Sequence, residues 1–330
     1  MRARLRISPE AYARLATYAL VALTLIVLTG AAVRLTGSGL GCPDWPKCYG
    51  KEVAPLETHA VIEYANRLFS GLVGVLAVAV SGFAFFRRPF RRDLALLGLL
   101  LPLGVVAQAV LGGFTVRERL APGFVMAHFC LSILILVAAV ALAWRARHAP
   151  GHRPAATDST SVWAVRALLP LGAVAIFAGT AATAAGPHAG GMNGQHINRL
   201  NFRGTGTMDW AIHWHARIAL LLGLATAGVW WLLRRRGADP QVRRWLTWAV
   251  ALVGAQGAVG TIQYLLHLPG WLVWVHASLA SLTWAALLWA TAQAGRPRPE
   301  PRAEAAPRPG SAETAPVALS PASGRSRSAV

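Results

Sequence analysis

The chain has 330 residues, of which 55% are hydrophobic and only 14% are charged, and its formal net charge is +19. This composition excludes an ordinary water-soluble globule and fits a membrane protein with several spans. The basic residues, nearly all of them arginines, lie in short segments between apolar stretches. We therefore interpret the charge as an orientation signal and expect no nucleic-acid partner.

Eight apolar stretches are each long enough to cross a bilayer, which takes roughly 20 helical residues. In chain order they cover about 13–34, 58–86, 94–115, 122–144, 162–185, 208–233, 244–265 and 269–293. The first stretch is too long for a removed signal peptide and lacks a small-residue cleavage site, so we interpret it as a span. The predicted fold class is an all-α polytopic membrane protein with eight transmembrane helices.

Arginine runs predict the orientation. Four segments, "MRARLR", "FFRRPFRRD", "WRARHAPGHR" and "LLRRRGADPQVRR", alternate with loops that lack such runs. Positively charged loops face the cytoplasm, so both termini are expected inside, with the spans in the cell (plasma) membrane against its lipid. This gives a cytoplasmic N-terminal segment at 1–11, a cytoplasmic linker at 146–160, and a Pro-, Ala- and Arg-rich tail at 295–330 that we expect to be disordered.

The chain contains an internal repeat. The stretch "AQAVLGGFTV" reappears loosely as "AQGAVGTIQY", which places Gln108 and Gln256 in matching positions. Each glutamine is followed 20 residues later by a histidine, His128 and His276, and both pairs are 148 residues apart. Duplication of a smaller unit is common in membrane proteins.

The repeat predicts two four-helix halves, at 12–145 and 161–294. Because four spans is an even number, the halves share one orientation and are parallel repeats. A cofactor site in one half is therefore expected to have a counterpart in the other.

Histidines cluster near the external ends of the even-numbered spans. His59 lies at the start of the second span. About two turns into later spans lie His128 in the fourth, His213 and His215 in the sixth, and His276 in the eighth. A lone intramembrane histidine is usually a packed residue, but imidazoles that face each other across a bundle hold haem iron by two axial ligands. Positions 213 and 215 are about 200° apart around a helix, so only one points inward, and we choose His215.

Several motifs carry a resemblance that covers the chain up to about residue 294. The loop "RLTGSGLGCPDWPKCYG", the Glu-x-x-x-Arg of "IEYANR", "QAVLGG" in the third span and "HA" in the sixth and eighth spans resemble the haem A synthase family. The resemblance implies a haem b site in the C-terminal half, with iron ligands His215 and His276. It also implies a substrate site for haem O in the N-terminal half, with iron ligand His128 and the essential acid Glu63.

One residue departs from the family pattern. The motif in the second span commonly reads Glu-x-x-His-Arg, and here Asn66 occupies the histidine position. This leaves His128 without an obvious partner. His59 lies on the same helix face but about 10 Å higher, and it could substitute as a ligand if the haem sits higher. A five-coordinate substrate iron is the other possibility.

Glu63 and Arg67 place two charges inside an apolar stretch, one helical turn apart. Such charges are expensive in a bilayer and face the bundle interior. They either form an i, i+4 pair that only neutralises itself, or Glu63 faces the substrate while Arg67 sets its ionisation or meets a haem propionate. We expect the second arrangement.

The resemblance implies the reaction. The C8 methyl group of haem O is oxidised to a formyl group, with oxygen from water, for cytochrome c oxidase assembly. A carboxylate suits this chemistry because it can act as a base toward water and stabilise positive charge at the methyl carbon. Haem O synthase is the implied donor, and the sequence does not identify the electron acceptor.

Cys42 and Cys48 flank "PDWPK" in the first external loop. Two thiols this close on an oxidising face indicate a disulfide or a redox-active pair, and we expect a disulfide. Cys130, in the fourth span, is interpreted as packing. The alternative functions are a di-haem membrane cytochrome b that exchanges electrons with quinone, and a haem-handling transporter.

Overall fold

A computed structural model describes residues 6–152, 158–192 and 194–295, all within one compact unit. The disordered tail expected at 295–330 lies outside the described residues apart from Gly295. Parts of the predicted N-terminal segment and linker, residues 1–5 and 153–157, also lie outside them.

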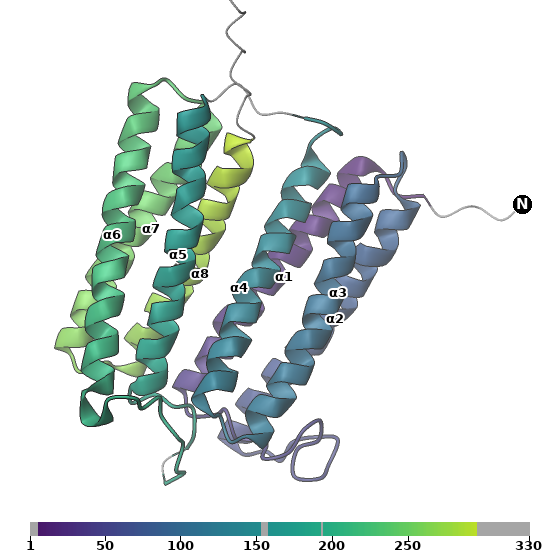
Figure 1. Cartoon of the computed structure of the whole chain (residues 1–330). Coiled ribbons are helices and arrows are strands. Elements are labelled where there is room, and N and C mark those ends of the chain that lie inside the picture. The colour runs from purple at the N-terminus through teal and green to yellow at the C-terminus, as the bar shows by residue number, and fades with distance from the viewer. Residues whose placement is uncertain (1–5, 153–157, 193, 296–330) are drawn as a thin grey trace, which may run out of the picture. The chain divides into compact units, whose positions relative to one another are not determined.

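The described residues fold into eight long helices (Figure 1). They are α1 (Pro9–Leu35), α2 (Thr58–Phe86), α3 (Arg92–Arg117), α4 (Pro122–Arg147), α5 (Ser159–Ala185), α6 (Thr207–Arg235), α7 (Pro240–Leu265) and α8 (Gly270–Ala294), with a short 3-10 turn, η1 (Gly204–Gly206), before α6. Each of these eight helices is long and apolar enough to cross a membrane. The predicted all-α, multi-pass membrane fold is confirmed for the described part of the chain. Helices satisfy their own backbone groups, as a bilayer requires.

Several helices begin a few residues before the predicted spans, because polar caps extend them. Ser8 accepts a hydrogen bond from the backbone N–H of Ala11 at 3.2 Å, and Asp158 accepts one from Ser161 at 3.0 Å. Proline occupies an early position of α1, α4 and α7, where its missing N–H costs no helical hydrogen bond. Hydropathy alone does not register these polar first turns.

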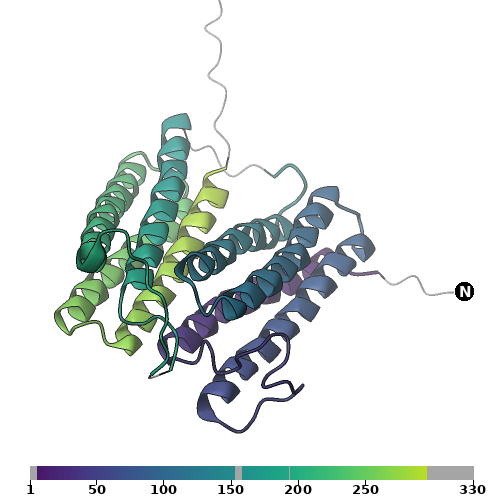
Figure 2. The same ribbon diagram turned by 60° about the horizontal axis from the view of Figure 1, so that its bottom comes forward.

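The helices form two neighbouring groups in Figures 1 and 2. Helices α1 to α4 each contact the next, and α1 also contacts α4. Helices α5 to α8 make the same set of contacts, with α5 against α8. The groups meet where α8 contacts α1 and α4, and where α4 contacts α5. Duplication of a four-helix unit stays a prediction.

Two tryptophans donate hydrogen bonds across the seam between the groups. The indole N–H of Trp284 in α8 bonds the carbonyl oxygen of Ile133 in α4 at 3.0 Å. The indole N–H of Trp274 bonds the carbonyl oxygen of Leu28 in α1 at 2.9 Å. A buried indole N–H normally finds such a partner, and these bonds join the two groups within the spans.

The two ends of the helices differ in character. At one end, Arg91 bonds Asp93 and the carbonyl oxygens of Arg145 and His148. The opposite end, which Figure 2 turns forward, carries the loops at 36–57 and 186–206 and the N-terminal ends of α2, α4, α6 and α8. All the predicted site residues lie in or near this second end.

Candidate functional site

Two histidines face each other in the group formed by α5 to α8. The ring centres of His215, in α6, and His276, in α8, are 6.0 Å apart and their planes lie 79° apart. An imidazole nitrogen binds a metal ion at about 2 Å, so two rings on opposite sides of one ion have centres roughly 6 Å apart. The pair therefore fits the two axial positions of a haem iron.

Hydrogen bonding orients the first of these rings. Nδ1 of His215 lies 3.0 Å from the carbonyl oxygen of Ala175 in α5. Because a carbonyl only accepts, Nδ1 carries the proton and Nε2 keeps its lone pair for a metal. Nδ1 of His276 is buried without a hydrogen-bond partner among the described residues. Such an orphaned polar atom is unusual in a packed interior.

Two glycines make room for these rings. A side-chain carbon at Gly179 would lie 2.9 Å from Cε1 of His215, and one at Gly260 would lie 3.2 Å from Cε1 of His276. We did not predict this role from the sequence. The sequence contained one sign of it for Gly260, which follows Gln256 by four residues just as Gly112 follows Gln108.

The neighbouring histidine lies outside this pair. His213 is exposed, and its Nδ1 bonds the carbonyl oxygen of Asp209, one turn earlier in α6, at 2.7 Å. The structure thus brings together His215 and His276, while His213 makes only a local contact.

His128, in α4, has surroundings similar to those of His276. Its Nδ1 is buried without a partner among the described residues, and its carbonyl oxygen accepts a hydrogen bond from Gln108 at 3.0 Å. Gln256 donates to the carbonyl oxygen of His276 at 3.5 Å. A side-chain carbon at Gly112 would lie 3.3 Å from Cε1 of His128. The environment of one ring is therefore present in both helix groups.

Glu63 is only 6% exposed, near the start of α2. Its Oε1 accepts hydrogen bonds from Nη2 and Nε of Arg67 at 2.5 and 3.2 Å. Its Oε2 accepts the backbone N–H of Cys42 at 2.8 Å. The carboxylate thus connects its own helix with the loop between α1 and α2.

Arg67 bonds the same loop through its remaining N–H groups. Nη1 donates to the carbonyl oxygens of Asp44 at 3.0 Å and Lys47 at 2.9 Å, and Nη2 donates to that of Cys42 at 3.3 Å. With the two bonds to Glu63, these contacts occupy the five N–H groups of the guanidinium. In this arrangement Arg67 positions the loop.

The loop is closed by a disulfide between Cys42 and Cys48, which confirms that prediction. The carboxylate of Asp44 accepts the backbone N–H groups of Tyr49 and Gly50, each at 2.7 Å. These bonds, that from Gly50 most strongly, hold the pKa of Asp44 below its usual range. Among the described residues, no group of three or more His, Cys, Asp or Glu side chains is placed to hold a bare metal ion.

The loop lies directly on the start of α2. A side-chain carbon at Gly41 would lie 2.2 Å from the carbonyl oxygen of His59, so only glycine fits there. This close approach allows Cys42 to reach the carboxylate of Glu63.

Comparison with known proteins places the chain in a family. A family model described as cytochrome oxidase assembly protein matches residues 13–61 and 56–288. The chain belongs to this family. It is 31% identical, over 280 residues, to a haem A synthase of Symbiobacterium thermophilum, an alignment that covers 80% of this chain and 89% of that relative.

Two further relatives are also similar to this chain. A haem A synthase of Shewanella oneidensis is 31% identical over 178 residues, which cover 48% of this chain and 50% of the relative. A protohaem IX farnesyltransferase of Thermus thermophilus is 32% identical over 295 residues, which cover 83% of this chain. That alignment covers only 47% of the farnesyltransferase.

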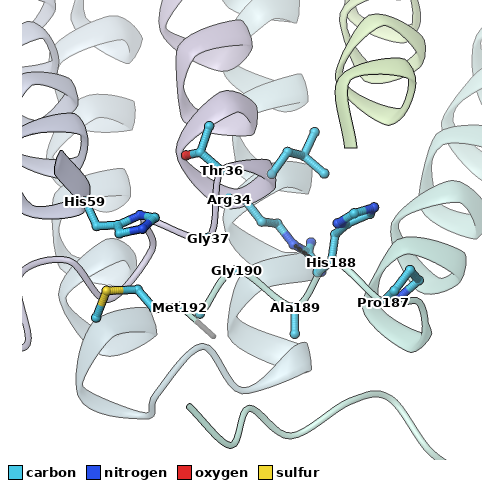
Figure 3. Close-up of a pocket in the computed structure, with 11 residues that line it drawn as sticks. Arg34, Thr36, Gly37, His59, Pro187, His188, Ala189, Gly190 and Met192 are labelled. Atoms are coloured by element: carbon cyan, nitrogen blue, oxygen red, sulfur yellow. Dashed lines mark hydrogen bonds between the residues drawn. The ribbon is translucent and has the colours of Figure 1, made fainter. Parts of the chain in front are cut away.

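In this family member, His59 lines a pocket of about 250 Å³ at the end of the helices that carries the long loops, together with Arg34, His188 and the chain from 187 to 192 (Figure 3). Nδ1 of His59 lies 2.9 Å from Oγ of Ser38. Figure 3 shows His59 and His188 on opposite sides of Arg34. The use of His59 as an iron ligand stays a prediction.

Proposed function

We propose that this protein is a haem A synthase, a membrane oxidoreductase that converts haem O to haem A for cytochrome oxidase assembly. The alignment with a haem A synthase over 80% of this chain carries the proposal. The facing rings of His215 and His276 support it, because they form a site that suits haem iron.

The C-terminal half holds haem b in this proposal, with His215 and His276 as its iron ligands. The haem supplies a centre that accepts and passes on single electrons. The protein orients the ligands: Ala175 fixes the tautomer of His215, and Gly179 and Gly260 let both rings lie against neighbouring helices.

The N-terminal half receives haem O, with His128 as a ligand of the substrate iron. Conversion of a methyl group and one water to a formyl group releases four protons and four electrons. We assign Glu63 as the group that takes a proton from the attacking water. Its burial and its fixed bonds to Arg67 and Cys42 support a defined position for the carboxylate.

The proposed partners follow from the reaction. Haem O synthase is the donor of the substrate, and a separate electron acceptor reoxidises the protein. The similarity to a region of a Thermus protohaem IX farnesyltransferase supports a close link between the two steps. We place the protein in the cell membrane with both termini in the cytoplasm, because the arginine-rich helix ends lie together.

Extraction of the bound haems tests this function. The protein is expressed with a haem O synthase in membranes that contain no haem A, and the extracted haems are identified by mass. Haem A, or haem O with a hydroxylated methyl group, is the expected product. Haem B alone would instead support a di-haem cytochrome b, and a bound but unmodified haem O would support a transporter.

A further inference from the structure

Helices α2 and α6 occupy corresponding places in the two helix groups, and one corresponding position holds Asn66 in α2 and His215 in α6. Helices α2 and α6 each have 29 residues, and they begin at Thr58 and Thr207. Asn66 and His215 both stand eight residues after these starts (66 − 58 = 215 − 207 = 8). Asn66 therefore occupies the place where α6 presents an imidazole ring.

The opposite position is the same in both groups. His128 and His276 each stand six residues after the starts of α4 and α8, at Pro122 and Gly270 (128 − 122 = 276 − 270 = 6). Both have a buried Nδ1 without a partner among the described residues. The N-terminal group thus retains one of two facing imidazoles.

Asparagine cannot simply replace the missing ring. Its Oδ1 is one bond from Cγ, whereas Nε2 of histidine is two bonds away, and an amide oxygen is a harder ligand than imidazole. Oδ1 of Asn66 is buried and has no hydrogen-bond partner among the described residues. A buried polar atom of this kind is suited to a hydrogen bond with a small bound molecule.

We propose that the N-terminal half binds its haem iron through His128 alone and leaves the opposite axial position, beside Asn66, open to a small neutral ligand such as water or carbon monoxide. This inference rests on the proposed function, since it requires a haem in that half. Oδ1 of Asn66 accepts a hydrogen bond from bound water, and carbon monoxide, which has no hydrogen to donate, serves only as a probe of the open position. The iron between His215 and His276 has no open position.

His59 is the competing ligand, and its contacts favour a different place. It stands one residue after the start of α2 and seven before Asn66, about 10 Å along the helix. Its Nδ1 faces Ser38, and its ring lines the external pocket with Arg34.

Carbon monoxide binding to the reduced holoprotein tests the proposal. The purified protein is supplemented with haem b until two haems are bound per chain, and the absorbance change is titrated with carbon monoxide. One carbon monoxide per two haems is expected. Asn66→His is expected to weaken this binding at least tenfold and to convert the second haem to a low-spin spectrum. His59→Ala is the matched control and keeps the one-to-two ratio. Asn66→Ala removes the proposed hydrogen-bond acceptor but adds no iron ligand, so it is also expected to take up one carbon monoxide per two haems.

The possible results distinguish failure of this inference from failure of the proposed function. The proposal is overturned if the two-haem protein takes up no carbon monoxide, if Asn66→His binds it as tightly as the unaltered chain, or if only one haem can be bound. Carbon monoxide binding that arises only in His59→Ala would identify His59 as the second ligand instead. An active protein that takes up no carbon monoxide contradicts this inference alone, and an inactive one that binds it contradicts the proposed function alone.

Discussion

Oε2 of Glu63 accepts the backbone N–H of Cys42 at 2.8 Å, so a carboxylate within the second span is bonded to the disulfide-closed loop at 36–57. Arg67 strengthens this connection through hydrogen bonds to four carbonyl oxygens of the loop. The pair is therefore more than a self-neutralising couple on one helix. A substitution of Glu63 is therefore expected to alter the conformation of the loop as well as contacts with a bound substrate.

Glu63→Gln is expected to insert into the membrane, keep the C-terminal haem and accumulate haem O or its hydroxylated form without haem A, because the amide is no base. If Glu63 only balanced Arg67, the main effect would instead be lost stability, about 3–5 kcal/mol for a broken buried pair. Haem extraction and thermal unfolding measure the two effects. The double variant Cys42→Ser with Cys48→Ser, which lacks the disulfide but keeps Glu63, is the control for effects that arise from the loop alone. Near-normal haem A production by Glu63→Gln would disprove the catalytic role.

His276→Ala is expected to remove the absorbance of the C-terminal haem, since one of the two facing rings is lost. His213→Ala is the matched control and is expected to keep that absorbance, because its ring is exposed and bonds only Asp209. Loss of the haem in His213→Ala but not in His215→Ala would show that the wrong face of α6 was assigned.

Gly260→Ala is expected to disturb the same haem without removing a ligand. The added carbon would lie 3.2 Å from Cε1 of His276, so the ring must shift. Overpacking of this kind costs about 1–3 kcal/mol. Gly257→Ala, in the same helix, meets no heavy atom within 4 Å and serves as the control. Visible spectra and the haem-to-protein ratio measure the effect, and equal values for the two variants would contradict it.

Acid is expected to loosen the external loop. Because the pKa of Asp44 is lowered in the folded protein, chiefly by the backbone N–H of Gly50, its carboxylate stabilises the loop above the unfolded pKa. That contribution is lost as pH falls through the folded pKa. The rate at which a phosphine reduces the Cys42–Cys48 disulfide should therefore rise in acid. In Asp44→Asn the disulfide should be reduced faster at neutral pH, and its reduction rate should depend less on pH. Parallel pH profiles for the two proteins would contradict the role of the Asp44 carboxylate in holding the loop.

Single cysteines placed near residues 90, 148 and 238 are expected to resist membrane-impermeant thiol reagents added from outside. The arginine-rich helix ends at these places predict a cytoplasmic location. A cysteine in the external loop, at Lys51, is the positive control. Labelling of the position beside Arg91 from outside would reverse the proposed orientation.

Hydropathy was sufficient to predict the eight helices of the described chain, because a bilayer permits few other structures. The disulfide followed from the proximity of Cys42 and Cys48 in the sequence. These features depend on local composition and spacing, which a sequence displays directly.

Other features depend on how distant segments meet. The hydrogen bonds of Arg67 to the loop and the contact of Gly179 with the ring of His215 join residues that no short motif links. The roles of the histidines and of Glu63 in binding and chemistry remain predictions. The interpretation of Arg67 as a partner for a haem propionate stays a prediction, and the bonds of its N–H groups to Glu63 and to backbone carbonyls were not apparent from the sequence.

The hydrogen bonds of Trp274 and Trp284 across the seam restrict how this protein can move. If the two helix groups slid past each other, both indole N–H groups would lose their acceptors, and the buried one of Trp284 would find no water as a replacement. Large rocking motions of the kind that transporters use would therefore carry an energetic penalty. A fixed seam of this kind is compatible with the proposed haem A synthase chemistry, in which electrons cross between the two helix groups and no alternation of domain positions is needed.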